Sequence, residues 1–219
     1  MHVAFLYTLE ANVALFRPYI NRYLGQADVT ISHHVNEALL QQAIELGEVA
    51  EVTESVQDAV KQLSANGADW VICTCSSIGD MAEQTPNIQA LVTRVDRPMA
   101  MKATTYKKVL VLAALESTIQ PTMALLEQCG QEQQQAPVIE TAIVPNAWSS
   151  FTSGDITTYA KVIADYINRI SGFDAIILAQ ASMAPALEHD ITTTTPVLTS
   201  PALCLTHIAD KLAQAKHST

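Results

Sequence analysis

The sequence predicts an α/β protein made of two similar parallel-sheet domains. Short apolar runs of strand length alternate with amphipathic segments of helix length, which is the pattern of parallel β-α-β units. Apolar residues make up 49% of the 219 positions and aromatic residues only 5%, which suits cores of Ala, Val, Leu and Ile. Two strand-and-turn segments also recur in the same order in each half of the chain. We therefore expect a duplicated fold with two pseudo-symmetric domains.

The first half contains three apolar runs of strand length, and each is separated from the next by helix-like sequence. The turn TLEAN after the first run leads into a helix that carries Leu15, Phe16, Tyr19 and Tyr23. Further on, valines recur every three or four residues, as in an amphipathic helix, and Gly67 closes it. The predicted elements are strands at 3–7, 29–31 and 70–74, and helices after the first strand, at 36–46 (capped by Asn36) and at 49–65.

The second half repeats this order. KVLVL at 108–112 predicts a strand, and Pro121 suits the first turn of the helix that follows. Asp155 caps a helix that continues to Ile170 and stops at Gly172. The last predicted elements are a strand at 174–179, polar connectors at 131–137 and 192–196, and a final helix after VLTSP.

The repeat becomes visible when NGADWVICTCSSIGD (66–80) is placed over SGFDAIILAQASMAP (171–185), an offset of 105 residues. Upstream, VAFLYTLEANV (3–13) aligns with VLVLAALESTI (109–119) at an offset of 106. Two alignments at nearly one offset indicate duplication of a βαβ half. The pairs at the second junction are Gly67 with Gly172, Asp69 with Asp174, Cys75 with Gln180, and Ser77 with Ser182.

Both repeated junctions follow a strand, and ligands of parallel α/β sheets bind beyond the carboxyl ends of strands. A two-fold arrangement would bring Cys75 and Gln180 to face each other. Cys73 belongs to the apolar run and is predicted to be a core residue, whereas Cys75 stands at the strand exit. Cys75 is therefore the candidate reactive thiol.

Composition excludes several classes of partner. The net charge of −10 argues against nucleic acid or an anionic membrane surface, so an anionic substrate needs local hydroxyls, N–H groups or helix N-termini. The N-terminal run lacks the basic region and cleavage site of a signal peptide, and no apolar stretch approaches the roughly 20 residues of a membrane span. Four cysteines at uneven spacings indicate reduced thiols in a cytoplasmic protein.

Cofactor motifs are missing from the sequence. It contains no G-x-G-x-x-G, no P-loop and no H-E-x-x-H. A zinc site built from the C-x-C segment with Cys129 and Cys204 is disfavoured, because this spacing matches no usual zinc knuckle.

The two junctions resemble those of the aspartate/glutamate racemase superfamily, which includes hydantoin racemases, arylmalonate decarboxylases and maleate isomerases. The resemblance covers nearly the whole chain and rests on TCSSIG, ALESTIQPT, DAIILAQASMA and VLTSP. It implies two pseudo-symmetric α/β domains with the active site in the cleft between them, a C-terminal helix that returns to the first domain, and no metal or organic cofactor. We expect a first domain at 1–102 joined by 197–219, and a second at 103–196.

The resemblance also implies roles for individual residues. In the two-base racemases of the family, a cysteine from each half flanks the substrate's α-carbon. The first of these maps onto Cys75, but the second position is Gln180, an amide that cannot act as a base. Family members hold the substrate carboxylate with hydroxyl and N–H groups near these junctions. The corresponding candidates here are Thr8, Asn12, Ser76, Ser77, Ser117, Thr118 and Ser182, together with Gln180.

The leading hypothesis is a cofactor-independent isomerase of this family that acts at the α-carbon of a small carboxylate, an amino acid or a related acid, with Cys75 as acid/base or nucleophile. The alternatives are an arylmalonate-decarboxylase-like enzyme, a maleate-isomerase-like enzyme, or a non-catalytic protein that binds a small carboxylate. A homodimer is an expected assembly, since dimers are common in families resembling this one.

Each candidate residue also has a purely structural interpretation. Cys75 could be a small packing residue, and the Ser and Thr hydroxyls could cap helices. His33 and His34 follow a predicted strand end, so either could reach the site as an acid or anion partner or could face solvent.

Overall fold

The computed structural model describes residues 1–47 and 50–217, with side chains described as far as residue 214. The predicted helix start at Val49 lies outside the described residues. The chain divides into two compact units, Met1–Val95 with Cys204–Thr219 and Asp96–Leu203. We refer to them as unit 1 and unit 2. The domain limits expected from the sequence, at 102/103 and 196/197, stay a prediction.

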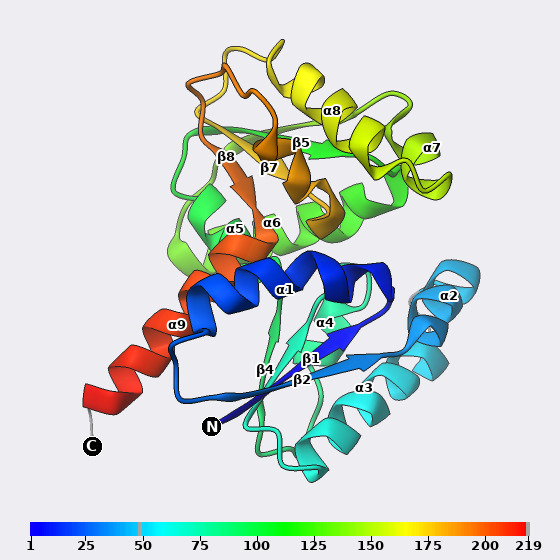
Figure 1. Ribbon diagram of the computed structural model, residues 1–219, viewed down its shortest axis with the longest axis vertical. Helices are drawn as coiled ribbons and strands as arrows, with labels where there is room; N and C mark the ends of the chain where they lie inside the picture. Colours follow the sequence, from blue (N-terminus) through cyan, green and yellow to red (C-terminus); the bar gives the residue numbers. More distant parts are fainter. Residues whose placement is uncertain (48–49, 218–219) are drawn as a thin grey trace. The chain divides into compact units, whose positions relative to one another are not determined.

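Unit 1 contains a four-stranded parallel sheet in the order β2-β1-β3-β4 (Figure 1). The buried apolar runs of the sequence form its two central strands, since the residues of β3 and five of the six in β1 are buried. The strands are β1 (His2–Tyr7), β2 (Thr30–Val35), β3 (Trp70–Cys73) and β4 (Leu91–Arg94).

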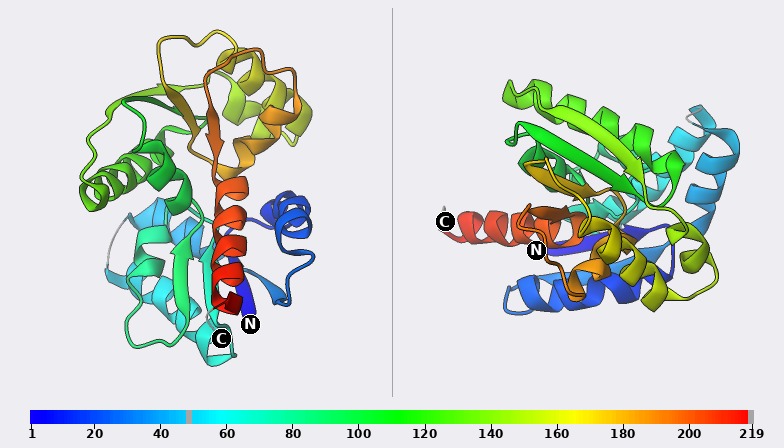
Figure 2. Two further views of the ribbon diagram at one scale, coloured as in Figure 1. Left: turned by 90° about the vertical axis from the view of Figure 1, so that its left-hand side faces the viewer. Right: turned by 90° about the horizontal axis from the view of Figure 1, so that it is seen from above.

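Helices cover both faces of this sheet. α2 (Glu37–Leu46) and α3 (Ala50–Ala65) pack on the face that carries Leu6 and Cys73. On the opposite face, α1 (Ala11–Leu24) packs Phe16 against Phe5, with ring centroids 6.3 Å apart. α9 (Ser200–His217) runs alongside the strands in Figure 2 and places His207 against Trp70. A short helix, α4 (Gly79–Glu83), follows β3.

Unit 2 repeats this plan with a parallel sheet in the order β6-β5-β7-β8. Two hydrophobic clusters, one on each face, join the helices to the sheet: α5 and α6 pack on one face, and α7 and α8 on the other. The strands are β5 (Lys108–Ala113), β6 (Val138–Ile143), β7 (Ala175–Leu178) and β8 (Val197–Thr199). The helices are α5 (Arg97–Ala103), η1 (Glu116–Thr118), α6 (Ile119–Gln133), α7 (Ala147–Thr152), α8 (Ile156–Ile167) and η2 (Ala181–Glu188).

The predicted duplicated α/β fold is confirmed, and the repeat extends to individual hydrogen bonds. In unit 1 the backbone N–H of His2 donates to Asp69 Oδ2 at 2.7 Å, and the Asp69 N–H donates to the His2 carbonyl at 2.9 Å. In unit 2 the Lys108 N–H donates to Asp174 Oδ2 at 2.9 Å, and the Asp174 N–H returns a bond to the Lys108 carbonyl at 2.8 Å. The paired aspartates of the sequence alignment therefore close the same two-bond ring in each sheet.

The glycines that precede these aspartates are also equivalent. Gly67 and Gly172 adopt φ values of 89° and 81°, a conformation that residues with a Cβ rarely adopt. Each therefore turns the chain from a helix into the next central strand, as the sequence predicts.

Three differences from the sequence-based elements affect the interpretation. β2 extends to Val35, so His33 and His34 lie within the strand rather than after its end, because the histidines continue the pairing with β1. α8 ends at Ile167 rather than Ile170. The strands β4, β6 and β8 were not predicted. Within the described residues, no helix is long and apolar enough to cross a membrane.

Candidate active site

Cys75 lies two residues beyond the end of β3, where the chain leaves the sheet of unit 1. β3 pairs with β1, so this exit is adjacent to the end of β1. The Cys75 side chain is half-buried and packs against the hydrophobic cluster on the α2–α3 side of the sheet. Cys73, by contrast, is fully buried within that cluster. The predicted difference between a core thiol and a thiol at the strand exit is therefore confirmed in its geometry.

The backbone on both sides of Cys75 is anchored. On one side, the Thr74 N–H and its Oγ1 both donate to the Leu6 carbonyl of β1, at 3.0 and 3.1 Å. On the other side, Arg94 Nη2 donates to the Ser76 carbonyl at 3.1 Å. The Cys73 thiol also approaches the Cys75 carbonyl, with Sγ 3.6 Å from the oxygen. The segment that presents Cys75 is therefore tied to β1 and to β4.

The other candidates of unit 1 lie at the same edge of the sheet. Thr8 follows β1 directly and is only 1% exposed, and Asn12 is buried in the first turn of α1. Ser76 and Ser77 are half-buried in the turn between β3 and α4. Because β1 and β3 are neighbours, the topology brings these four residues and Cys75 to one edge.

In unit 2 the candidates occupy the corresponding edge, at the ends of β5 and β7. Gln180 is the first residue before η2, and its side-chain oxygen accepts a hydrogen bond from the Ala114 N–H at 2.7 Å. Gln180 therefore links the exits of the two central strands. Ser117 and Thr118 lie in η1 directly after β5, where Thr118 is buried and Ser117 is exposed.

Ser182 has a partner that the sequence did not reveal. The Tyr159 hydroxyl lies 3.0 Å from Ser182 Oγ. Tyr159 is fully buried in α8, and this burial raises the pKa of its phenol to about 12, with the Ser182 hydrogen bond opposing the rise. The phenol is therefore neutral at physiological pH and orients the Ser182 hydroxyl as a hydrogen-bonding partner.

The two histidines project to opposite faces of β2. His33 Nδ1 lies 2.9 Å from the hydroxyl of the buried Tyr7, and the two rings stack at 5.6 Å. Burial is the main cause that lowers the pKa of His33, with Arg17 and His34 adding to it. His34 shares Ser32 Oγ with His2, at 2.9 and 2.7 Å respectively, and burial likewise lowers its pKa. Both histidines are thus engaged along the strand, with His33 paired in register with Phe5 rather than at the strand exit.

Two residues of these junctions were missed by sequence reasoning, Arg94 and Tyr159. Arg94 belongs to the unpredicted strand β4, and Tyr159 lies within the helix predicted to begin at Asp155. No signal in the sequence connects either residue with the junction. Within the described residues, no group of three or more His, Cys, Asp or Glu side chains could hold a metal ion.

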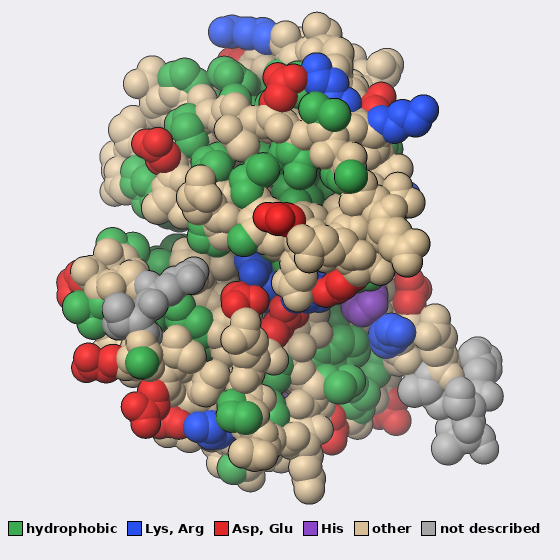
Figure 3. Space-filling model, turned by 180° about the vertical axis from the view of Figure 1, so that it is seen from behind, with side chains coloured by type: hydrophobic (Ala, Val, Ile, Leu, Met, Phe, Trp, Pro, Cys, Tyr) green, Lys and Arg blue, Asp and Glu red, His purple; other side chains and the backbone are tan. Residues whose placement is uncertain are grey.

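A cavity of about 410 Å³ lies at the other end of the unit 1 sheet. Trp70 and Leu91 begin β3 and β4 there, and α9 adds His207 and Lys211. Figure 3 shows hydrophobic side chains beside a histidine and a basic residue on this face. None of the described residues that line the cavity belongs to the predicted site.

No protein-family model matches the sequence, and no curated protein sequence is significantly similar to it. Solved structures, however, match over nearly the whole chain. The aspartate racemase of Picrophilus torridus superposes with a TM-score of 0.68 at 16% identity, over 95% of this chain and 94% of its own.

Two further structures extend the likeness beyond amino-acid racemases. The allantoin racemase of Klebsiella pneumoniae superposes with a TM-score of 0.63 at 15% identity, over 99% of this chain and 89% of its own. An arylmalonate decarboxylase superposes with a TM-score of 0.56 at 16% identity, over 97% of this chain and 92% of its own. The chain has the fold of the Asp/Glu racemases. At these identities the likeness concerns the fold, and the chemistry has to be argued from the junction residues.

Proposed function

We propose that this protein is a cofactor-independent enzyme of the aspartate/glutamate racemase superfamily that acts at the α-carbon of a small carboxylate, with Cys75 as acid/base or nucleophile. The observation that carries the proposal is the place of Cys75, half-buried at the exit of a central strand, beside Thr8, Ser76 and Ser77. The shared fold of two racemases and a decarboxylase supports the same class of chemistry. We expect the enzyme to act in the cytoplasm.

The proposed chemistry needs a base and a stabilised anion. A Cys75 thiolate removes the α-proton of the substrate, and the electron pair left behind forms an enediolate with the carboxylate. Fixed hydroxyl and N–H donors then stabilise the enediolate, which is usually the largest catalytic contribution. Ser76 and Ser77 would supply these donors from unit 1. Ser117, Thr118 and Ser182, together with Asn12, are the further proposed substrate contacts.

Gln180 favours single-thiol chemistry within this class. An amide cannot exchange protons as a base, and the Gln180 side-chain oxygen already accepts the Ala114 N–H. Gln180 Nε2 is a donor that would bind a substrate oxygen. A single thiol delivers its proton to one face of the carbanion, so it suits an arylmalonate-decarboxylase-like reaction. A single thiolate could instead add to a double bond, as in a maleate-isomerase-like reaction.

The test is proton exchange in deuterated water with amino acids, hydantoins, malonates and maleate, followed by NMR and chiral chromatography. Deuterium at the α-carbon without inversion indicates single-thiol exchange, whereas release of CO₂ or formation of fumarate identifies the alternative reactions. Cys75→Ser abolishes the activity if the proposal holds, and Cys129→Ser, a change at a buried cysteine of unit 2, is the matched control. Full activity of Cys75→Ser on the true substrate contradicts the mechanism.

A non-catalytic protein that binds a small carboxylate gives a different result in the same experiment. It shows saturable binding by calorimetry without turnover of any compound, and its Cys75 reacts slowly with iodoacetamide. Gln180→Cys is a further variant, which places a thiol at the position of the second racemase cysteine. If Cys75 is the base, this variant should both exchange the α-proton and invert the configuration of the α-carbon.

A further inference from the structure

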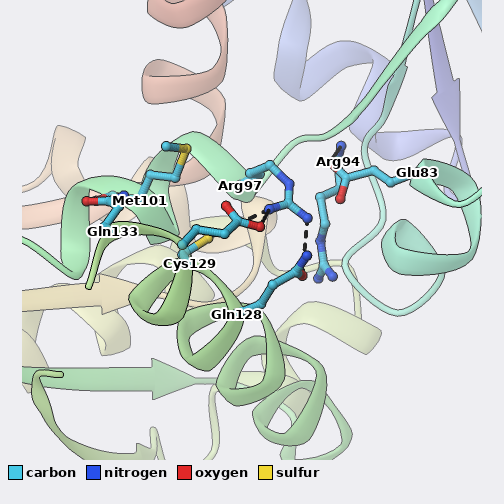
Figure 4. Close-up of polar contacts among 8 residues, drawn as sticks. Glu83, Arg94, Arg97, Met101, Gln128, Cys129 and Gln133 are labelled. Atoms are coloured by element: carbon cyan, nitrogen blue, oxygen red, sulfur yellow. Dashed lines mark hydrogen bonds and ion pairs between the residues drawn. The ribbon is translucent and has the colours of Figure 1, made fainter. Parts of the chain in front are cut away.

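Arg94 is a buried cation next to the turn that presents Cys75. It is the last residue of β4 and is 2% exposed. Among its contacts, the guanidinium donates from Nη2 to the Ser76 carbonyl at 3.1 Å, and the backbone N–H donates to Glu83 Oε1 at 3.0 Å. In Figure 4 the Glu83 side chain comes from α4 toward the Arg94 backbone. Arg94 therefore contacts both ends of the segment from Ser76 to Glu83.

Gly79 lies against the same arginine. A Cβ added at Gly79 would be 2.8 Å from Arg94 Cβ and 2.9 Å from Arg94 Nε, closer than real Cβ contacts. The backbone at the start of α4 thus rests directly on the Arg94 side chain, and only glycine leaves room for it there.

The bond to the Ser76 carbonyl fixes the direction of a peptide group. In a trans peptide the C=O and the N–H point in opposite directions, and the chain contains no cis peptide bond among its described residues. Holding the Ser76 carbonyl toward Arg94 therefore directs the Ser77 N–H away from Arg94. A charged donor on the carbonyl also polarises the peptide, which strengthens its N–H as a donor.

We propose that Arg94 is a positioning residue that aims the Ser77 N–H at a carboxylate bound beside Cys75, and that Gly79 keeps the Arg94 side chain in place. The inference rests on the proposed function, because it assumes that the carboxylate of the substrate binds at this junction. Arg94 acts through the Ser76–Ser77 peptide and does not itself touch the substrate.

Two alkylating probes of nearly the same shape test this without turnover. The Cys75 thiolate displaces iodide from iodoacetate or iodoacetamide and forms a thioether, and only iodoacetate carries a carboxylate. The readout is the ratio of the two rate constants at Cys75, measured by peptide mass spectrometry and divided by the ratio for free cysteine. In the unmodified protein we expect this normalised ratio to exceed one, with saturation by iodoacetate.

Variants separate orientation from charge. Arg94→Met should lower the normalised ratio by about tenfold, the equivalent of one charge-assisted hydrogen bond. Gly79→Ala keeps the charge but displaces the side chain, and it should lower the ratio in the same direction. Arg22→Met, which removes an exposed arginine of unit 1, is the matched control and should leave the ratio unchanged.

The outcomes are distinct. An unchanged normalised ratio in a folded Arg94→Met or Gly79→Ala protein overturns the inference. An Arg94→Lys protein with the same normalised ratio as the unmodified protein also overturns it, because a positive charge alone would then account for the effect. If Arg94→Met does not fold, Gly79→Ala decides. If the ratio falls as expected but no compound of the panel is turned over, the proposed reaction fails while the role of Arg94 stands.

Discussion

Cys73→Ala and Cys75→Ala form a matched pair of variants that distinguishes a cysteine needed for packing from one needed for activity. Cys73 is 0% exposed within the hydrophobic cluster of unit 1, so truncation removes one methylene-sized group, worth about 0.8 kcal/mol. The sulfur leaves a void of roughly 20 Å³, which adds about 0.5 kcal/mol at 24 cal/mol per Å³. Cys75 is half-buried, and its truncation should cost about 0.5 kcal/mol or less because the edge of the site can relax.

Unit 1 can be followed through its own tryptophan. The chain has two tryptophans, Trp70 in unit 1 and Trp148 in unit 2, so a Trp148→Phe background leaves a reporter of unit 1 alone. In urea titrations of this background followed by Trp70 fluorescence, Cys73→Ala should lower the midpoint of unfolding by about 0.5 M or more. The midpoint of Cys75→Ala should stay close to that of the Trp148→Phe protein. Activity should show the reverse order.

The result that would refute this reasoning is equally specific. If Cys75→Ala shifts the Trp70 midpoint as far as Cys73→Ala and leaves activity unchanged, then Cys75 is a packing residue. The parent and both variants need coincident fluorescence and circular-dichroism transitions for unit 1, because two units need not unfold together.

Three further predictions use other contacts. Asp69→Ala should destabilise unit 1 by about 1 kcal/mol, and Asp174→Ala should destabilise unit 2 by the same amount, because each carboxylate accepts a hydrogen bond from a backbone N–H of its own sheet. The fluorescence of Trp70 and of Trp148 reports the two units separately. Tyr159→Phe removes the partner of Ser182 and should raise KM more than it lowers kcat, measured on the substrate found in the exchange panel; an unchanged KM would separate Ser182 from binding. Burial lowers the pKa of His33 in the folded state below the ordinary value of 6.5, so the unfolded chain binds more protons than the folded one. The free energy of unfolding should therefore fall as the pH drops below about 6.5. Urea titrations near pH 7.5 and 5.5 should show that His33→Gln loses less of this free energy than the unmodified protein.

The sequence predicted the central strands well because they are the most strongly patterned elements. β1 and β3 are almost entirely buried, so their apolar runs stand out from the surrounding sequence. Three of the four edge strands, β4, β6 and β8, were missed for the opposite reason. β6 exposes Glu140 and Thr141, and β8 has only three residues, so neither shows the apolar run of a buried strand.

The candidate site likewise contains residues that the sequence predicted and others, such as Arg94, that it did not. Cys75 and Gln180 follow central strands, and the repeat placed both at equivalent exits. Arg94 was not identified because its contact with the turn is made by a side chain that reaches from an edge strand to the Ser76 carbonyl. Contacts of this kind join residues far apart in the sequence and leave no local pattern.

The division of the chain into units has a consequence for its synthesis. Unit 2 is one continuous segment, Asp96–Leu203, whereas unit 1 also needs residues from Cys204 onward. Cys204, Leu205 and Ile208 are fully buried and belong to α9, which follows unit 2 in the sequence. During translation, all residues of unit 2 are therefore synthesised before the segment from Cys204 onward that unit 1 needs. Unit 2 can complete its core at that stage, whereas unit 1 still lacks the part of its core that α9 supplies. The unit that carries the proposed catalytic thiol, Cys75, is therefore completed after unit 2.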